Sequence, residues 1–173
     1  MLKKRLGIEA IEKDWSEEYM HDYYKIPSTL VIPEGCDMIG DWAFYKCEEL
    51  RKVVISESVG RIGYYAFKYC SWLREVIIPK SVKNIGDRAF RECKKLEKVV
   101  ISEGVKWISA NSFWGCEELK ELIIPKSVEW IGSYAFYGCV NATIILQKPK
   151  NEFKEIQLRA FSGCKDVKEE TRN

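Results

Sequence analysis

Five cysteines recur at intervals of 23 residues in this chain, and a sixth follows after 25 residues. They are Cys47, Cys70, Cys93, Cys116, Cys139 and Cys164. A period kept over so many repeats predicts a stack of similar coils, because each coil of a solenoid contacts only its neighbours and repeats the same inward positions. Such a chain is expected to be a scaffold whose chemistry, if any, lies on its outward side chains.

Other residues recur in register with the cysteines. Two of the columns are Phe44, Phe67, Phe90, Phe113, Phe136 and Phe161, and Ile39, Ile62, Ile85, Ile108, Ile131 and Ile156. Leu50, Val53 and Ile55 have the spacing L-x-x-L-x-L, whose last two members share one face of a short strand. The rest of the coil is expected to return along the other side as a short extended piece, a turn at Gly63 and about one helical turn.

The repeat therefore predicts an α/β fold. We expect a right-handed leucine-rich-repeat solenoid of about six 23-residue coils, with a parallel strand ladder on one face and short extended and helical turns on the other. The expected divisions are an N-terminal helical cap (1–28), the solenoid (29–168), within it a divergent last coil that forms a C-terminal cap (144–168), and a tail (169–173). The N-terminal helix is predicted from a stripe of apolar residues at helical spacing, Ile8, Ile11, Trp15 and Tyr19. The alternative is a detachable helix that binds a partner.

Composition limits the possible functions. The 28 basic and 26 acidic side chains leave a net charge of +2, so the molecule lacks the strong positive field of a typical nucleic-acid binder. No stretch is long and apolar enough to span a membrane. The basic N-terminus, Met1 to Arg5, is not followed by the apolar segment of a secretion signal. The sequence as written favours a cytoplasmic protein, whereas a processed form would be secreted or on the cell surface.

Neither metal nor catalytic chemistry is expected. Seven cysteines without a CxxC pair fit neither a closed disulfide framework nor a zinc site, so we interpret them as buried free thiols. The only histidine, His21, has no recognisable nucleophile or acid near it in the sequence. We expect no cofactor and no enzymatic activity.

The outward positions of the strands form the first candidate binding surface. Between the inward residues of each strand lies a β-branched residue, and before it a charged residue whose sign alternates from coil to coil. The predicted strand-face residues are Lys52, Val54, Glu75, Ile77, Lys98, Val100, Glu121 and Ile123. An exposed apolar stripe favours a groove for a protein partner, although lateral packing between neighbouring strands also explains such residues.

Two further sets are candidates. Trp107 and Trp130 occupy one column just before the repeated isoleucine, where large aromatic side chains either anchor a partner or cover the seams between coils. Residues 80–98 carry a local excess of positive charge, and the outward cations on that side are Arg88, Arg91, Lys94 and Lys95. That basic side is either a solvated surface or a docking site for nucleic acid or an acidic protein.

The repeated motif I-P-x-x-V-x-x-I-G-x-x-A-F-x-x-C-x-x-L, as in residues 78–96, resembles the BspA-like, or Treponema-type, leucine-rich repeats. The resemblance covers residues 30 to about 164. It implies a protein-binding molecule, commonly a surface or secreted adhesion protein of bacteria or of some parasitic protists.

These features favour a non-catalytic scaffold that binds another protein through the strand face and the aromatic positions. One alternative is an intracellular inhibitor or adaptor that docks on an enzyme or nucleoprotein through the basic side. The other is a module for adhesion to a host or matrix. Nucleic acid is the less favoured partner.

Overall fold

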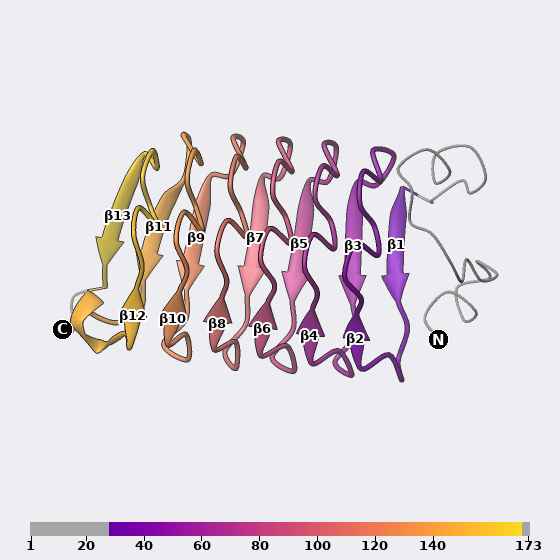
Figure 1. Cartoon of the computed structure of the whole chain (residues 1–173), viewed down its shortest axis with the longest axis horizontal. Coiled ribbons are helices and arrows are strands. Elements are labelled where there is room, and N and C mark those ends of the chain that lie inside the picture. Colours follow the sequence, from indigo (N-terminus) through magenta and orange to yellow (C-terminus); the bar gives the residue numbers. More distant parts are fainter. Residues whose placement is uncertain (1–27, 171–173) are drawn as a thin grey trace.

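The computed structural model describes residues 28–170 as an elongated stack of coils (Figure 1). Each coil contributes one four-residue strand and one two-residue strand. The long strands are β1 (Thr29–Ile32), β3 (Lys52–Ile55), β5 (Glu75–Ile78), β7 (Lys98–Ile101), β9 (Glu121–Ile124), β11 (Thr143–Leu146) and β13 (Asp166–Glu169). The short strands are β2 (Met38–Ile39), β4 (Arg61–Ile62), β6 (Asn84–Ile85), β8 (Trp107–Ile108), β10 (Trp130–Ile131) and β12 (Glu155–Ile156). The expected parallel solenoid of about six coils is confirmed.

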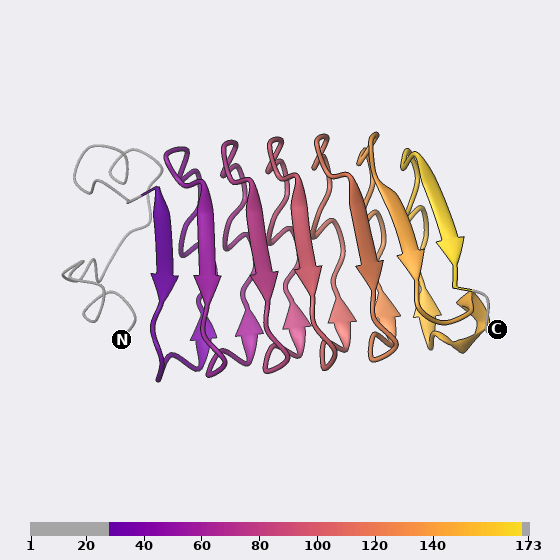
Figure 2. The ribbon, with the colours of Figure 1, turned by 180° about the vertical axis from the view of Figure 1, so that it is seen from behind.

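All strands pair in parallel, and the two kinds of strand lie on opposite faces of the stack. The six short strands form one continuous sheet, in the order β12-β10-β8-β6-β4-β2. The long strands form two separate sheets, β1-β3-β5-β7 and β13-β11-β9. The short strands lie in front in Figure 1, and the long strands lie in front in the reverse view of Figure 2.

Exposed and buried positions alternate along most long strands, and this pattern explains why these residues form strands. In β3, Val53 and Ile55 are buried while Lys52 and Val54 are exposed, and most long strands repeat this pattern. Successive side chains of a strand point to opposite faces, so two apolar positions per strand enter the core. The phenylalanine column fills the centre, with neighbouring rings stacked and their centroids 5.2 to 5.7 Å apart.

The expected helical turn in each coil is wrong, and so is the α/β class. Within residues 28–170 the only helix is a 3-10 turn, η1 (Lys150–Glu152). In the turn segments, backbone N–H groups bond to the next coil: Phe67 N donates to Ala89 O at 2.7 Å and Tyr69 N to Arg91 O at 2.9 Å. A helix would direct those donors to its own carbonyl groups four residues earlier. Left-handed residues, such as Tyr69 with φ 64°, also interrupt any helix.

The predicted N-terminal helical cap and His21 lie outside the described residues. At the other end, β13 continues the ladder by pairing with β11, a strand that the sequence analysis does not predict. Its last residue, Glu169, falls where a tail is expected. The extra residues after β11 are accommodated by η1, after which β12 pairs with β10 in register.

The cysteines are free thiols, as predicted, and all except the half-buried Cys164 are buried. Each thiol in the main column from Cys70 onward donates to the carbonyl of the phenylalanine in the preceding coil. Cys70 Sγ lies 3.1 Å from Phe44 O, and Cys93 Sγ lies 3.2 Å from Phe67 O. Burial raises the pKa of the Cys93 thiol, which therefore stays protonated as a hydrogen-bond donor.

Candidate protein-binding surfaces

The outward β-branched residues form a continuous apolar stripe across the long strands. Val31, Val54, Ile77, Val100 and Ile123 are 38% to 54% exposed, whereas their inward neighbours are buried. The register places Val31 beside Val54 and Ile77 beside Val100. Single exposed apolar residues are common on soluble proteins, but an aligned row of five is a candidate contact surface.

The stripe crosses a groove where the long-strand ladder is interrupted. No pairing joins β7 to β9 in the described chain, and Lys120 N to Glu97 O, at 3.4 Å, is the only backbone hydrogen bond that links the start of these two strands. A groove of about 620 Å³ lies there, with Val100 and Ile123 among its lining residues. Its charged lining residues are Glu97, Lys98, Lys120 and Glu121. Four predicted strand-face residues therefore line one groove.

The alternating charges pair across the first strands of the ladder. Glu75 accepts from Lys98 at 3.0 Å and lies 3.5 Å from Lys52. The hydrogen bond from Lys98, with the nearby charge of Lys52, holds the pKa of Glu75 below its ordinary value. This part of the face is neutralised internally, as the alternation predicts, and it offers little attraction to a polyanion.

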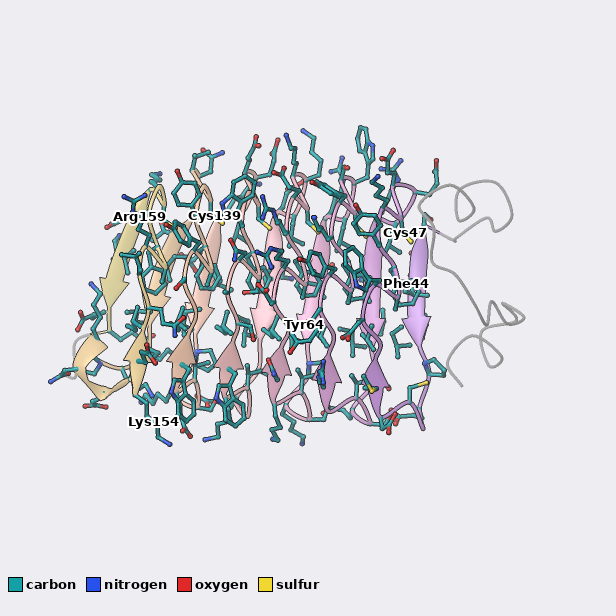
Figure 3. The ribbon with its side chains drawn as sticks, viewed as in Figure 1. Phe44, Cys47, Tyr64, Cys139, Lys154 and Arg159 are labelled. Atoms are coloured by element: carbon teal, nitrogen blue, oxygen red, sulfur yellow. The ribbon has the colours of Figure 1, made fainter. Side chains whose placement is uncertain are left out.

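The tryptophan pair lies on the other face of the molecule. Trp107 and Trp130 belong to β8 and β10, and their rings stack with centroids 5.2 Å apart and planes 11° apart. Lys154, which is labelled in Figure 3, lies 4.4 Å from the centre of the Trp130 ring and also pairs with Glu129 at 2.6 Å. The structure therefore brings the two tryptophans together but does not join them to the long-strand face.

Most of the predicted basic side is neutralised by acidic neighbours. Arg88 pairs with Asp87 at 2.6 Å. Lys94 lies 3.5 Å from Glu117, and Lys95 lies 2.8 Å from Glu118, both in the next coil. Arg91 instead lies 4.2 Å from the centre of the Trp114 ring, with no carboxylate partner in the described part of the chain.

A cluster of aromatic and basic side chains lies on the turn side, and the sequence analysis, which considered the cations separately, does not predict it. Three positions from consecutive coils form a stack, in which Trp42 and Tyr65 lie 4.0 Å apart and Arg88 lies 5.4 Å from the Tyr65 ring. Lys68 lies 4.9 Å from the Tyr65 ring and 4.6 Å from the Tyr69 ring. The signal that could have revealed the cluster is that Lys68 and Arg91 are one period apart, beside a column of aromatic residues.

The described residues contain no group of acidic, histidine or cysteine side chains arranged to hold a metal ion. In residues 28–170, no helix has the length and apolar character needed to cross a membrane.

Comparison with known proteins identifies the fold. A family model described as a BspA type leucine rich repeat region, present in six copies, matches residues 17–143 and 83–171. A leucine rich cell surface protein from Faecalibacterium prausnitzii is 27% identical, with a TM-score of 0.68 over 82% of this chain and 43% of that one. A leucine rich repeat protein from T. pallidum is 21% identical, with a TM-score of 0.60 over 82% of this chain and 73% of that one.

The pneumococcal vaccine antigen PcpA is 25% identical, with a TM-score of 0.60 over 73% of this chain and 31% of that one. No curated protein matches the chain. This chain spans less than half the length of the F. prausnitzii protein that it resembles.

The molecule is thus a leucine-rich-repeat solenoid. The chain belongs to the BspA-type leucine-rich repeat family, which confirms the resemblance seen in the sequence. Solenoids of this class are typically non-enzymatic scaffolds, and such repeats commonly serve protein binding or adhesion.

Proposed function

We propose that the chain is a non-catalytic scaffold that binds another protein through its long-strand face, centred on the groove between β7 and β9. The observation that carries this proposal is the coincidence of the apolar stripe with the groove. Val100 and Ile123 are both exposed and both line it. A concave site with apolar residues and a few polar groups is the usual form of a binding pocket.

The charges at the groove favour a polypeptide as its ligand. Glu97 and Glu121 alternate with Lys98 and Lys120 around the apolar residues. Glu97 also pairs with Lys120 at 3.2 Å and with Arg74 at 3.2 Å. A mixed rim gives no net attraction to a uniformly charged polymer but complements the mixed side chains of a protein, and it sets specificity more than affinity.

Adhesion at a cell surface is a second candidate function. It is supported by the 27% identity to a protein described as a leucine rich cell surface protein. On that proposal the partner is a host or matrix protein, and the chain acts outside the cell. The same long-strand face would carry the contact.

Paired capture experiments test both candidates. The wild-type chain and a Val100→Asp, Ile123→Asp variant are used to capture proteins from a cell lysate and, separately, from an extracellular-matrix preparation. The control is Trp107→Asp, which places a negative charge on the opposite face. A buried charge opposite an apolar partner costs several kcal/mol, so we expect at least about a tenfold loss of the specific partner in the first variant only.

Capture that survives the double substitution but is lost with Trp107→Asp would overturn the long-strand proposal. Enrichment of specific partners only from the matrix preparation would favour adhesion, and enrichment only from the lysate would contradict it. Thermal melting of each variant checks that the solenoid stays folded.

A further inference from the structure

The cluster on the turn side combines cations with stacked aromatic rings, and binding through the long-strand face does not require it. It consists of Trp42, Tyr45, Lys68, Tyr65, Tyr69, Arg88 and Arg91, which we call the cation-aromatic cluster. Its residues come from three consecutive coils and lie on the face opposite the long strands, in the segments that follow the short strands (Figure 1). Its role is therefore separate from the function proposed above.

Two cations of the cluster lack an acidic partner. Within residues 28–170, Lys68 and Arg91 form no ion pair, in contrast to Arg88, Lys94 and Lys95. The Nε atom of Arg91 is buried and has no hydrogen-bond partner in the described structure. Lys68 and Arg91 occupy neighbouring coils one period apart, and like charges that lack acidic partners in the described chain repel each other and favour a bound anion.

The titration of Lys68 agrees with this geometry. Burial lowers the pKa of Lys68, and the charges of Arg91, Arg88 and Lys46 lower it further. Glu92 opposes this effect, but its carboxylate also lies 3.7 Å from Lys94. The site therefore has an excess of positive charge that its own acidic residues do not neutralise.

Several residues of the cluster have a left-handed backbone conformation. Trp42, Tyr65 and Arg88 have φ values of 60°, 56° and 55°, and Tyr69 has 64°. For residues other than glycine this left-handed conformation costs roughly 1 to 2 kcal/mol each. Later coils place Gly115, Gly138 and Gly163 in the column of Tyr69, so the fold accepts glycine there. Asn111, Tyr134 and Arg159, which occupy the column of Trp42 in later coils, also have positive φ, so this conformation belongs to the repeat as a whole and does not distinguish the cluster.

The arrangement of the rings indicates which anion the cluster fits. Trp42 in the preceding coil and Arg88 in the following coil cover the faces of Tyr65, and Arg91 covers Trp114. Bases of a single-stranded nucleic acid bind by stacking on open ring faces, and the faces of Tyr65 are already occupied by Trp42 and Arg88. The edges of aromatic rings carry partial positive charge, which complements carboxylates.

We propose that the cation-aromatic cluster binds an acidic segment of a partner protein, whose carboxylates are taken by Lys68 and Arg91. Arg88, which is paired with Asp87, covers a face of the Tyr65 ring beside them. The aromatic edges and the tyrosine hydroxyl groups line the contact. The solenoid then has two binding faces, an apolar groove on one side and an anion-binding cluster on the other.

The test is a titration of the folded chain with a polyglutamate peptide at low ionic strength, where the Debye length is about 30 Å. The test variant is Lys68→Gln with Arg91→Gln. The matched control is Lys94→Gln with Lys95→Gln, which removes the same charge from a neighbouring part of the same side, where both lysines are ion-paired. We expect about a tenfold or greater loss of affinity in the test variant and less than about a threefold loss in the control.

A second measurement uses only the wild-type chain. In lysine acetylation with and without the peptide, bound peptide is expected to protect Lys68 but not Lys94 or Lys95. Equal losses in the two variants, no binding by the wild type, or no protection of Lys68 would each overturn the proposal. Tighter binding of a sulfated oligosaccharide or of oligothymidylate through Lys68 and Arg91 would also overturn it, in favour of a glycan or nucleic-acid site.

Discussion

Ser112 is the one buried polar residue of the core in the described structure. It stands in a column that is alanine in the other coils, and its hydroxyl group has no hydrogen-bond partner among residues 28–170. A buried polar group without a partner costs roughly 1 to 3 kcal/mol. We therefore expect Ser112→Ala to raise the free energy of unfolding by about 1 kcal/mol, measured by urea denaturation.

The control for this prediction is Ser109→Ala in the same coil. The Ser109 hydroxyl group lies 3.1 Å from Asn84 Oδ1, so its removal should destabilise the fold by about 0.5 to 1.5 kcal/mol. If Ser112→Ala lowers stability as much as Ser109→Ala does, the hydroxyl group of Ser112 is satisfied and our interpretation is wrong.

At the level of the element, the coil of Gly86 lies close to the coil of Gly63 because both residues lack a side chain, whereas later coils have Ser109 and Gln157 in this column. A Cβ atom on Gly86 would lie 2.6 Å from the backbone of Gly63, whereas one on Gly40 would meet no atom of residues 28–170 within 4 Å. We expect Gly86→Ala to destabilise the fold by about 1 to 3 kcal/mol through overpacking. The same change at Gly40 should be neutral or stabilising by about 0.4 to 1 kcal/mol, because it reduces the freedom of the unfolded chain.

Thermal and denaturant unfolding of the two variants compare the same substitution at the same repeat position. Similar destabilisation by Gly40→Ala and Gly86→Ala would show that the column is needed for its backbone conformation and not for close approach between coils.

Glu129 joins the β10 region to its neighbours and makes the fold sensitive to acid. Hydrogen bonds from Lys106 and then Lys154, at 2.8 and 2.6 Å, lower the pKa of Glu129 to about 2. A carboxyl group whose pKa is lower in the folded state stabilises that state above its unfolded pKa, near 4.3. This contribution is therefore complete near neutral pH and is lost as the pH falls from about 4.3 through about 2.

In Glu129→Gln, the decline of stability over that pH range should be shallower than in the wild type. Unfolding measured from pH 7 to pH 2 provides the comparison, and high salt should reduce the difference. An unchanged slope in the variant would contradict the role given to Glu129.

For the whole molecule, the period alone predicts the stack, the inward columns and the sign alternation of Lys52, Glu75 and Lys98. The stack, the columns and the alternation all depend on which residues lie one coil apart, and a fixed period identifies those residues directly. The predicted helical turn fails because the N–H groups of residues such as Phe67 and Tyr69 bond between coils. The local sequence pattern does not show whether a backbone N–H group bonds within its own coil or to the next coil.

The candidate surfaces are less predictable for the same reason. The sequence identifies Val100 and Ile123 as outward but not the interruption of the ladder beside them. It places Trp107 with the strand face, although β8 lies in the other sheet. It counts four outward cations on the basic side, whereas Arg88, Lys94 and Lys95 have acidic partners and, of the four, only Arg91 has no carboxylate partner in residues 28–170.

Photo-cross-linking tests most directly whether the long-strand face binds the protein partner. Benzoylphenylalanine replaces Val100 on the long-strand face in one variant and Trp107 on the opposite face in another, and each is irradiated with the captured partner. We predict a specific adduct from position 100, mapped by mass spectrometry, and none from position 107. Adducts from position 107 without any from position 100 would contradict the account.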